Sequence, residues 1–170
     1  NIIAPAKLTL SLKVTGVRGD GFHLIDSEMV SLELHDVLTI NEGESGMSVS
    51  GQFSRGVPTD ANNLVARALQ LCGKNASVHI EKNIPHGGGL GGGSSDAAAV
   101  LRWAGYSDLI AASRLGADIP FCMLGGRARV TGIGEILEPL PFVAREFTLV
   151  VPPFGVSTPA VYRAFDSLQA

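Results

Sequence analysis

The sequence predicts a domain of the α+β class on the basis of three patterns. Apolar and polar residues alternate in several short segments between residues 7 and 50, as in half-buried β-strands. An apolar stripe then recurs at helical spacing over residues 60–72. A glycine-rich loop at residues 87–93 leads into helix-forming residues at 97–101. Antiparallel strands together with helices in one chain are typical of the α+β class.

Composition sets the size and the general character of the protein. With 170 residues, 45% of them hydrophobic and 17% charged, the chain suffices for one domain with a full core, or for one domain and part of a second. A formal net charge of −3 gives no general attraction for nucleic acid or an anionic membrane. No run of about 18 apolar residues occurs, so we expect a cytoplasmic protein. Cys72 and Cys122 lie in apolar contexts without metal-ligand spacing, which favours buried free thiols.

The first strand is predicted around residues 8–14, where apolar and polar side chains alternate. Lys7 and Thr9 are two positions apart, so they should point to the same side of this strand. From residue 28 to residue 50, short apolar runs predict further antiparallel strands. We expect a turn at His35 between two of these strands.

The central part of the chain predicts a helix and then a strand. Residues 60–72 form an amphipathic pattern that stops at Gly73, a residue suited to end a helix. Residues 76–81 alternate again and predict a strand that leads toward the glycine-rich loop. His79 falls between the apolar positions of this strand, so we expect its side chain to face solvent.

Smaller elements are predicted after the glycine-rich loop and its helix. Ser107 is expected to cap a short helix that ends at Gly116. Residues 121–139 are expected to form sheet and turns, and residues 147–153 a further strand. A new helix is predicted to open around residues 161–165.

The glycine-rich loop is the strongest functional signal in the sequence. Six of the seven residues 87–93 are glycine, which permits positive φ angles and close approach of a ligand to the backbone. Ser94, Ser95 and Asp96 follow and are good N-cap residues, so a helix should open here. Unpaired N–H groups and the helix dipole make such a helix start suitable for phosphate. A flexible linker is the alternative, but linkers are not usually followed by a cap and an alanine-rich helix.

Two common phosphate motifs do not fit this loop. Gly87, Gly89 and Gly92 satisfy the spacing GxGxxG, but a dinucleotide fold needs a second parallel strand ending in an acid about 20 residues further on. The region around Asp108 instead indicates a helix or a loop. No Gly-Lys-Ser/Thr follows the glycines, so the loop is not a Walker A motif either.

The loop resembles the second motif of the GHMP kinases. It runs PHGGGLGGGSSDAAA from Pro85, where the family pattern is proline, then Gly-Leu-Gly-Ser-Ser-Ala after a few residues. APAKLTL at residues 4–10 resembles the first motif of that family, with Thr9 where asparagine is usual, and GADIP at residues 116–120 resembles a third site segment. The resemblance implies a two-layer domain like the second domain of ribosomal protein S5 over residues 1–145. The start of a ferredoxin-like C-terminal domain would occupy residues 146–170.

The resemblance also implies an ATP site and a catalytic pair. Lys7 would pair with the transferring phosphoryl group or lower the pKa of the substrate hydroxyl, and Asp118 would contact that hydroxyl and take its proton. Mg²⁺ would be held with the help of Ser94 or Ser95. The residues implied to bind ATP are Asn63, Lys82, Pro85, Gly87, Gly88, Gly89, Leu90, Gly91, Gly92, Gly93, Ser94 and Ser95.

The implied substrate carries a cytidine diphosphate on methylerythritol. GDGFH at residues 19–23 resembles a family segment in which the aromatic ring stacks on cytosine and the histidine hydrogen-bonds it, roles that fall on Phe22 and His23. VSTPAVY at residues 156–162 resembles a later segment, in which Tyr162 would be a second stacking ring. Thr9 and Thr158 are further substrate contacts by resemblance.

Other functions remain open from the sequence. A mevalonate-type or homoserine-type kinase would share the glycine-rich loop, but should not carry the aromatic-histidine pair or Tyr162. A non-catalytic nucleotide-binding fragment is the alternative from another class, because a third glycine-rich motif of the form G-[ST]-G-x-[ST] does not occur in the 170 residues. The sequence does not predict an oligomeric state.

Overall fold

A computed structural model describes residues 1–151, 154–155 and 157–169 of the chain. Within these residues one sheet is formed by six strands: β1 (Ile2–Val17), β2 (His23–Glu42), β3 (Met47–Ser50), β4 (Ala76–Glu81), β5 (Arg127–Gly132) and β6 (Ile136–Pro139). The helices in the same residues are α1 (Leu64–Leu71), α2 (Gly92–Trp103), α3 (Leu109–Ser113), α4 (Ile119–Leu124) and α5 (Thr158–Gln169).

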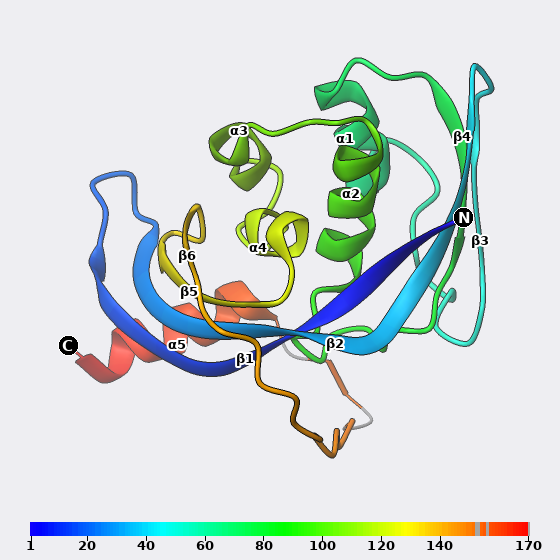
Figure 1. Cartoon of the computed structure of the whole chain (residues 1–170). Helices are drawn as coiled ribbons and strands as arrows, with labels where there is room; N and C mark the ends of the chain where they lie inside the picture. The colour runs from blue at the N-terminus through cyan, green and yellow to red at the C-terminus, as the bar shows by residue number, and fades with distance from the viewer. Residues whose placement is uncertain (152–153, 156, 170) are drawn as a thin grey trace.

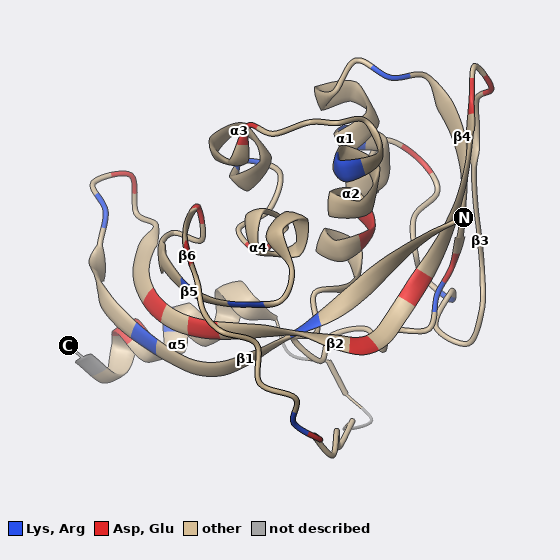
Figure 2. Cartoon of the chain, viewed as in Figure 1, with Lys and Arg blue, Asp and Glu red and all other residues tan. Residues whose placement is uncertain are grey.

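The long strand β2 organises the sheet. It pairs antiparallel with β1 along one edge, and with β5 and β4 along the other edge. Leu38, for example, lies between Ile2 of β1 and Ile80 of β4. The edge strand β3 runs parallel to β4, and β6 pairs antiparallel with β5. Figure 2 shows acidic residues along β2, and two of them, Asp26 and Glu28, form ion pairs with Arg129 and Arg127 of β5.

Helices α1 to α4 gather over one side of the curved strands, whereas α5 runs alongside β1 and β2 (Figure 1). The main core lies between the sheet and these four helices, where Leu38, Ile80, Leu101 and Phe121 are buried. A smaller cluster around Ala6, Ile84 and Leu90 packs beneath the glycine-rich loop. The resulting arrangement is the predicted α+β fold of a sheet layer and a helix layer.

Several predicted elements are confirmed. The strand at 76–81 has the predicted bounds, and His79 is exposed, with both ring nitrogens within hydrogen-bond distance of Ser48 and Ser50. Helix α1 lies inside the predicted range 60–72, and Gly73 follows it with φ +65°. A helix does open late in the chain, and it begins at Thr158. Cys122 is a buried free thiol as expected, whereas Cys72 is only half-buried.

The predicted turn at His35 is wrong, because β2 continues through this position. His35 pairs with Pro5 of β1, and the neighbouring Asp36 is fully buried. A buried aspartate fits inside a strand here because its carboxylate accepts hydrogen bonds from the backbone N–H groups of Asn83 and Ile84. The polar His-Asp pair therefore marked an internal contact and not a chain reversal.

The helix boundaries differ from prediction at two N-termini. Helix α2 begins at Gly92, so Ser94 and Ser95 lie in its first turn, and the cap position is taken by Gly91 with φ +69°. Only glycine adopts this left-handed conformation without strain, which explains why the serines do not act as the cap. Asp108, not Ser107, caps α3, because its side chain accepts a hydrogen bond from Ala111 N.

Two strand predictions in the last third of the chain are also wrong. Residues 121–124 belong to helix α4, which starts with Pro120 in its first turn, a position where the missing N–H costs nothing. Residues 147–151 form no strand. The predicted strand also includes residues 152 and 153, and the VSTPAVY segment includes residue 156; these three residues lie outside the described residues.

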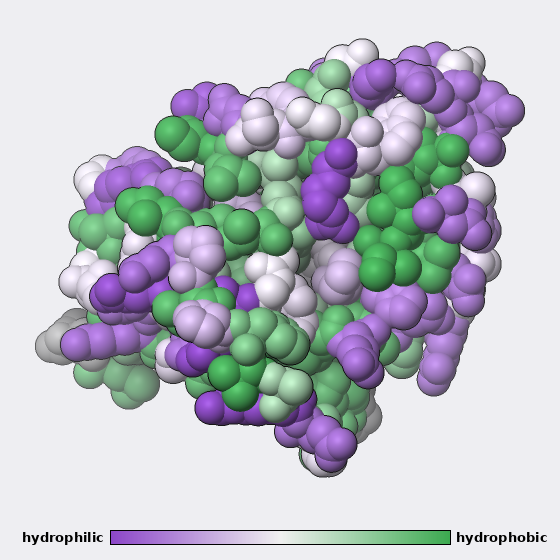
Figure 3. All heavy atoms as spheres, viewed as in Figure 1, coloured by the Kyte–Doolittle hydropathy of each residue, from purple (hydrophilic) through white to green (hydrophobic). Residues whose placement is uncertain are grey.

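The surface mixes apolar and polar groups. Figure 3 shows hydrophobic and hydrophilic residues interleaved over the face that carries the four helices. No helix among the described residues has the length and apolarity that a membrane crossing needs.

Candidate functional site

The glycine-rich loop and the start of α2 form a candidate anion site. Gly87, Gly89 and Gly91 all have φ near +70°, with values of 69°, 70° and 69°. Among the described residues, no side chain caps α2, so its first N–H groups are not occupied by a capping oxygen. Together with the helix dipole, these groups favour a phosphate at this point.

Lys7 and Asp118 meet beside this helix start. The ammonium of Lys7 lies 3.2 Å from Asp118 Oδ2 and donates a hydrogen bond to Thr9 Oγ1 at 3.1 Å. The backbone N–H of Lys7 donates to Leu90 O at 2.9 Å, which ties β1 to the glycine-rich loop. The Lys7 side chain is 8% exposed and that of Asp118 is 32% exposed, so the carboxylate is the accessible member of the pair. The predicted catalytic residues are thus brought together, with Thr9 on the same side of β1.

Asp118 is positioned by a tight packing contact from the turn between β5 and β6. It is the N-cap residue of α4, directly after Ala117. A Cβ placed on Gly134 would lie 2.2 Å from Ala117 O, and Gly134 has φ +132°. Because no side chain fits there, the turn at Gly134 supports the backbone that presents Asp118.

We predict that Gly134→Ala destabilises the protein and displaces Asp118. The new methyl group would meet backbone atoms, which cannot move aside as a flexible side chain could, so the free energy of unfolding should fall by about 2 kcal/mol or more. Gly126→Ala is the matched control, because Gly126 also has positive φ (72°) but an added Cβ would meet nothing within 4 Å. Urea unfolding of both variants tests this, and equal losses would show that the Ala117 contact is unimportant.

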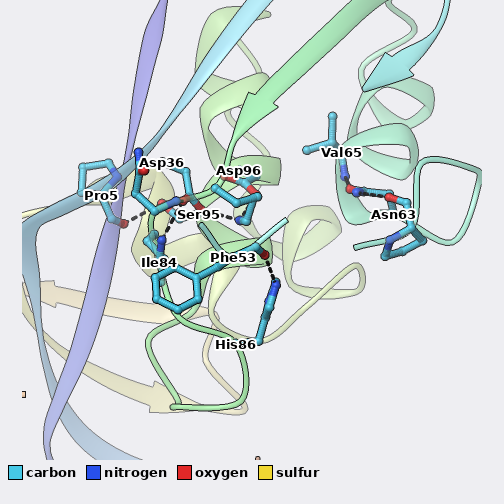
Figure 4. Close-up of polar contacts among 12 residues, drawn as sticks. Pro5, Asp36, Phe53, Asn63, Val65, Ile84, His86, Ser95 and Asp96 are labelled. Atoms are coloured by element: carbon cyan, nitrogen blue, oxygen red, sulfur yellow. Dashed lines mark hydrogen bonds and ion pairs between the residues drawn. The ribbon is translucent and has the colours of Figure 1, made fainter. Parts of the chain in front are cut away.

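The two serines of the loop motif have different environments. The Ser95 side chain is fully buried, and its hydroxyl donates to Pro5 O at 2.6 Å (Figure 4). Ser94 is half-buried, and its Oγ lies 3.6 Å from the position that a Cβ on Gly116 would occupy, beside the Asp118 turn. Of the two predicted metal contacts, Ser94 is therefore the one with an available hydroxyl.

Two residues predicted to bind ATP have their polar groups occupied. Asn63 caps α1, since its Oδ1 accepts from Val65 N at 2.8 Å (Figure 4) and its Nδ2 donates to Pro58 O at 2.7 Å. Lys82 is 2% exposed and its ammonium is bound to Asp36 and Asp96. Only the Lys82 ammonium lies against the loop, 3.4 Å from the position that a Cβ on Gly92 would occupy. Each group keeps some hydrogen-bonding capacity, since the ammonium has a third N–H and the amide a second N–H, so their contact with ATP stays a prediction.

The residues predicted to hold the substrate base meet only in part. The rings of His23 and Tyr162 stack with centroids 4.5 Å apart and an interplanar angle of 21°. His23 Nε2 also lies 2.7 Å from Asp166 Oδ1 of α5. Phe22 is 57% exposed and carries the Arg18 guanidinium over its ring at 5.7 Å. The structure therefore joins His23 to Tyr162 and leaves the face of Phe22 to Arg18.

A cavity of about 740 Å³ lies between Tyr162 and the glycine-rich loop. Gly87, Gly88 and Gly89 line one side, and Thr158 and Tyr162 line another. The remaining lining is largely apolar, with Leu8, Leu12 and Leu90 among it. Burial raises the pKa of the Tyr162 phenol, and the Asp118 carboxylate raises it further.

Asp36 and Asp96 were not predicted as site residues. Asp96 was read as a helix cap, and Asp36 as the neighbour of a turn residue. Their one sequence signal is that each stands beside otherwise apolar positions of a strand or helix, where an unpaired carboxylate is too costly to bury. Such a position calls for a buried partner, which is Lys82.

Comparison with known proteins gives the class. Residues 60–126 match the N-terminal domain of the GHMP kinases. The fold alone is shared with a putative homoserine kinase from Listeria monocytogenes, at 16% identity and a TM-score of 0.54 over 99% of this chain and 65% of that one. The chain therefore carries an N-terminal domain of the GHMP kinase type, as its glycine-rich loop predicts.

Three of the similar proteins carry the name of one enzyme of that family. The chain is 48% identical over 162 residues to the 4-diphosphocytidyl-2-C-methyl-D-erythritol kinase of Paracoccus denitrificans, covering 95% of this chain and 59% of the relative. The kinase of the same name from Clostridium botulinum is 41% identical, covering 98% of this chain and 65% of the relative. A crystal structure of 4-(cytidine 5'-diphospho)-2C-methyl-D-erythritol kinase matches at 37% identity and a TM-score of 0.70, over 95% of this chain and 63% of that one. The chain thus spans less than two thirds of the length of these relatives.

Proposed function

We propose that the chain takes part in ATP-dependent phosphorylation of the 2-hydroxyl of 4-diphosphocytidyl-2-C-methyl-D-erythritol, a step of the non-mevalonate (MEP) route to isoprenoids. The observation that carries this proposal is the 3.2 Å pair of Lys7 and Asp118 beside the uncapped start of α2. The names of the relatives supply the substrate. Residues 1–145 would form the nucleotide and catalytic part, and residues 146–170 the beginning of a second domain.

Phosphoryl transfer asks the protein for alignment and for positive charge near the moving group. The first N–H groups of α2 would hold the ATP phosphates, with the loop glycines allowing the close approach. Lys7 would place its ammonium beside the transferring phosphoryl group. Asp118, the more exposed partner, would accept the proton of the attacking hydroxyl.

A magnesium ion would neutralise charge on the ATP phosphates during the transfer. The residues at the helix start fit this cation, because the Ser94 hydroxyl is an oxygen donor next to the phosphate position and is not taken by a protein acceptor in the way that Ser95 is. The rest of the coordination would come from the phosphates themselves and from water.

The cytidine end would lie in the cavity on the α5 side. Tyr162 and His23 supply an aromatic pair, and Thr158 a hydroxyl, at the rim of a space that begins at Gly87. In the structure His23 rests on Tyr162, so a base would enter by separating these rings or by stacking on their outer faces. Phe22 would contribute its exposed ring from the adjoining turn.

The experiment is ATP consumption by the purified chain with the cytidyl substrate and Mg²⁺, beside mevalonate and homoserine as controls. Turnover with the cytidyl substrate alone supports the proposal. Turnover with mevalonate or homoserine would instead assign another kinase of the family. ATP binding without turnover on any of the three would mean that this chain is a nucleotide-binding part of the enzyme and does not catalyse the transfer.

A further inference from the structure

A buried group of three charges lies directly under the glycine-rich loop. The ammonium of Lys82 donates to Asp36 Oδ2 and to Asp96 Oδ2, the latter at 2.6 Å. Lys82 is 2% exposed, Asp96 is 3% exposed and Asp36 is fully buried. These side chains come from three different places: Asp36 from β2, Lys82 from the residue after β4, and Asp96 from α2. We call this group the Lys82 triad.

The triad holds both ends of the loop. On the entry side, Asp36 Oδ1 accepts from the backbone N–H groups of Asn83 and Ile84, at 2.5 and 2.9 Å, immediately before Pro85 (Figure 4). On the exit side, Asp96 anchors the first turns of α2. A Cβ on Gly92, the first residue of α2, would lie 3.4 Å from Lys82 Nζ. The ammonium therefore sits just behind the N–H groups that face a phosphate.

Stability alone does not account for such a triad. Removing an ammonium and two carboxylates from water costs several kcal/mol for each ion, and well-packed apolar side chains are often as stabilising in their place. The network instead fixes where the chain runs, since its hydrogen bonds specify the positions of two backbone N–H groups and one helix. A network of this kind is expected where the backbone around a binding site has to be held in one position.

The two carboxylates have unequal roles. Asp36 accepts from three donors, namely Lys82 Nζ and two backbone N–H groups. Asp96 receives only the Lys82 ammonium, and its Oδ1 has no hydrogen-bond partner among the described residues. Burial raises the pKa of Asp96 to about 7, so this carboxyl readily takes a proton. Asp36 is accordingly the anchor, and Asp96 the member that can be neutral.

We infer that Asp36, acting through Lys82 and the backbone of residues 83–84, is a positioning residue for the ATP phosphates, and that Asp96 serves this role without needing its charge. The inference rests on the proposed function in one respect, which is that the loop binds ATP. It adds two residues on β2 and α2 that make no contact with ATP themselves.

Two isosteric variants separate these roles. In Asp36→Asn, one acceptor oxygen is replaced by an NH₂ group, which can only donate. This group must face either the Lys82 ammonium or the two backbone N–H groups, so the hydrogen bonds on one of these sides are lost. In Asp96→Asn, the amide oxygen can still accept from Lys82. We expect Asp36→Asn to weaken binding of a non-hydrolysable ATP analogue by roughly 10-fold or more, and Asp96→Asn to change it by less than about 3-fold.

Calorimetric titration with the ATP analogue and Mg²⁺ measures the affinity for the nucleotide. Titration with cytidine diphosphate measures the affinity of the proposed cytidine site. A positioning role predicts that Asp36→Asn keeps its cytidine diphosphate affinity, while a general loss of structure would weaken both. Hydrogen exchange should also rise at residues 83–94 relative to β4 in this variant. If Asp36→Asn does not fold, Asp36→Asn/Lys82→Met removes the opposing charge and is measured in its place.

Three outcomes decide the inference. ATP-analogue affinity in Asp36→Asn, or in the double variant, equal to that of the unmodified chain would overturn it. Equal losses in Asp36→Asn and Asp96→Asn would overturn the unequal roles of the two carboxylates. If the unmodified chain itself does not bind the ATP analogue, the proposed function fails instead, so the two failures are distinguishable.

Discussion

Asp118→Asn is expected to lower kcat by roughly 10²-fold or more while ATP affinity stays nearly the same. The amide keeps the size of the carboxylate but cannot accept the proton of the substrate hydroxyl. It also leaves the Lys7 ammonium, 3.2 Å away, without its ionic partner. Because Asp118 lies at the N-cap of α4, where asparagine is also favourable, the fold itself should tolerate the change.

Asp108→Asn is the matched control for this variant. Asp108 is likewise a helix N-cap, on α3, and its side chain accepts from Ala111 N at 2.9 Å, a bond that asparagine can also accept. It lies apart from the cavity and the glycine-rich loop. Steady-state kinetics with the cytidyl substrate should show a normal kcat for Asp108→Asn. Near-normal turnover in Asp118→Asn would remove Asp118 from the role of base.

The sequence predicted the parts of the site that depend on short local patterns. A lysine two positions before a threonine on a strand predicts that the two share a face, and the hydrogen bond between Lys7 and Thr9 confirms it. Likewise, glycines followed by a run of helix formers predicted a loop and a helix start, and α2 begins there. The pairing of Lys7 with Asp118 followed from family resemblance, because nothing local links residues 111 positions apart in the chain.

The misreading of Asp36 and Asp96 has one physical cause, which is that each was assigned to a turn or a cap when its partner lay elsewhere in the chain. Asp36 and Asp96 both bind Lys82, a contact that spans 46 residues in one case and 14 in the other. Local propensity favours aspartate at turns and helix starts. It does not take into account an ammonium group that is distant in the sequence and buried beside the aspartate in the fold. The predicted contact of Lys82 with ATP stays a prediction.

Gly91→Ala should impair the enzyme through Lys7 and not only through the loop. A Cβ on Gly91 would lie 2.9 Å from Lys7 Cγ and 3.3 Å from Lys7 Cε. The Lys7 backbone is held by its hydrogen bond to Leu90 O, so the side chain must move to make room. A shift of about 1 Å in an aligned catalytic group can cost on the order of 10²-fold in rate, so we expect kcat to fall at least 10-fold.

Gly89→Ala separates this effect from backbone strain. Gly89 and Gly91 have nearly identical φ angles, 70° and 69°, so an alanine at either position is strained by about 1–2 kcal/mol. An added Cβ on Gly89, however, would meet nothing within 4 Å. The two variants should therefore melt at similar temperatures and share any loss of ATP affinity, whereas Gly91→Ala alone should show the additional fall in kcat. If kcat fell equally in both, the contact between the loop and Lys7 would not matter for transfer, and strain in the loop would be the whole effect.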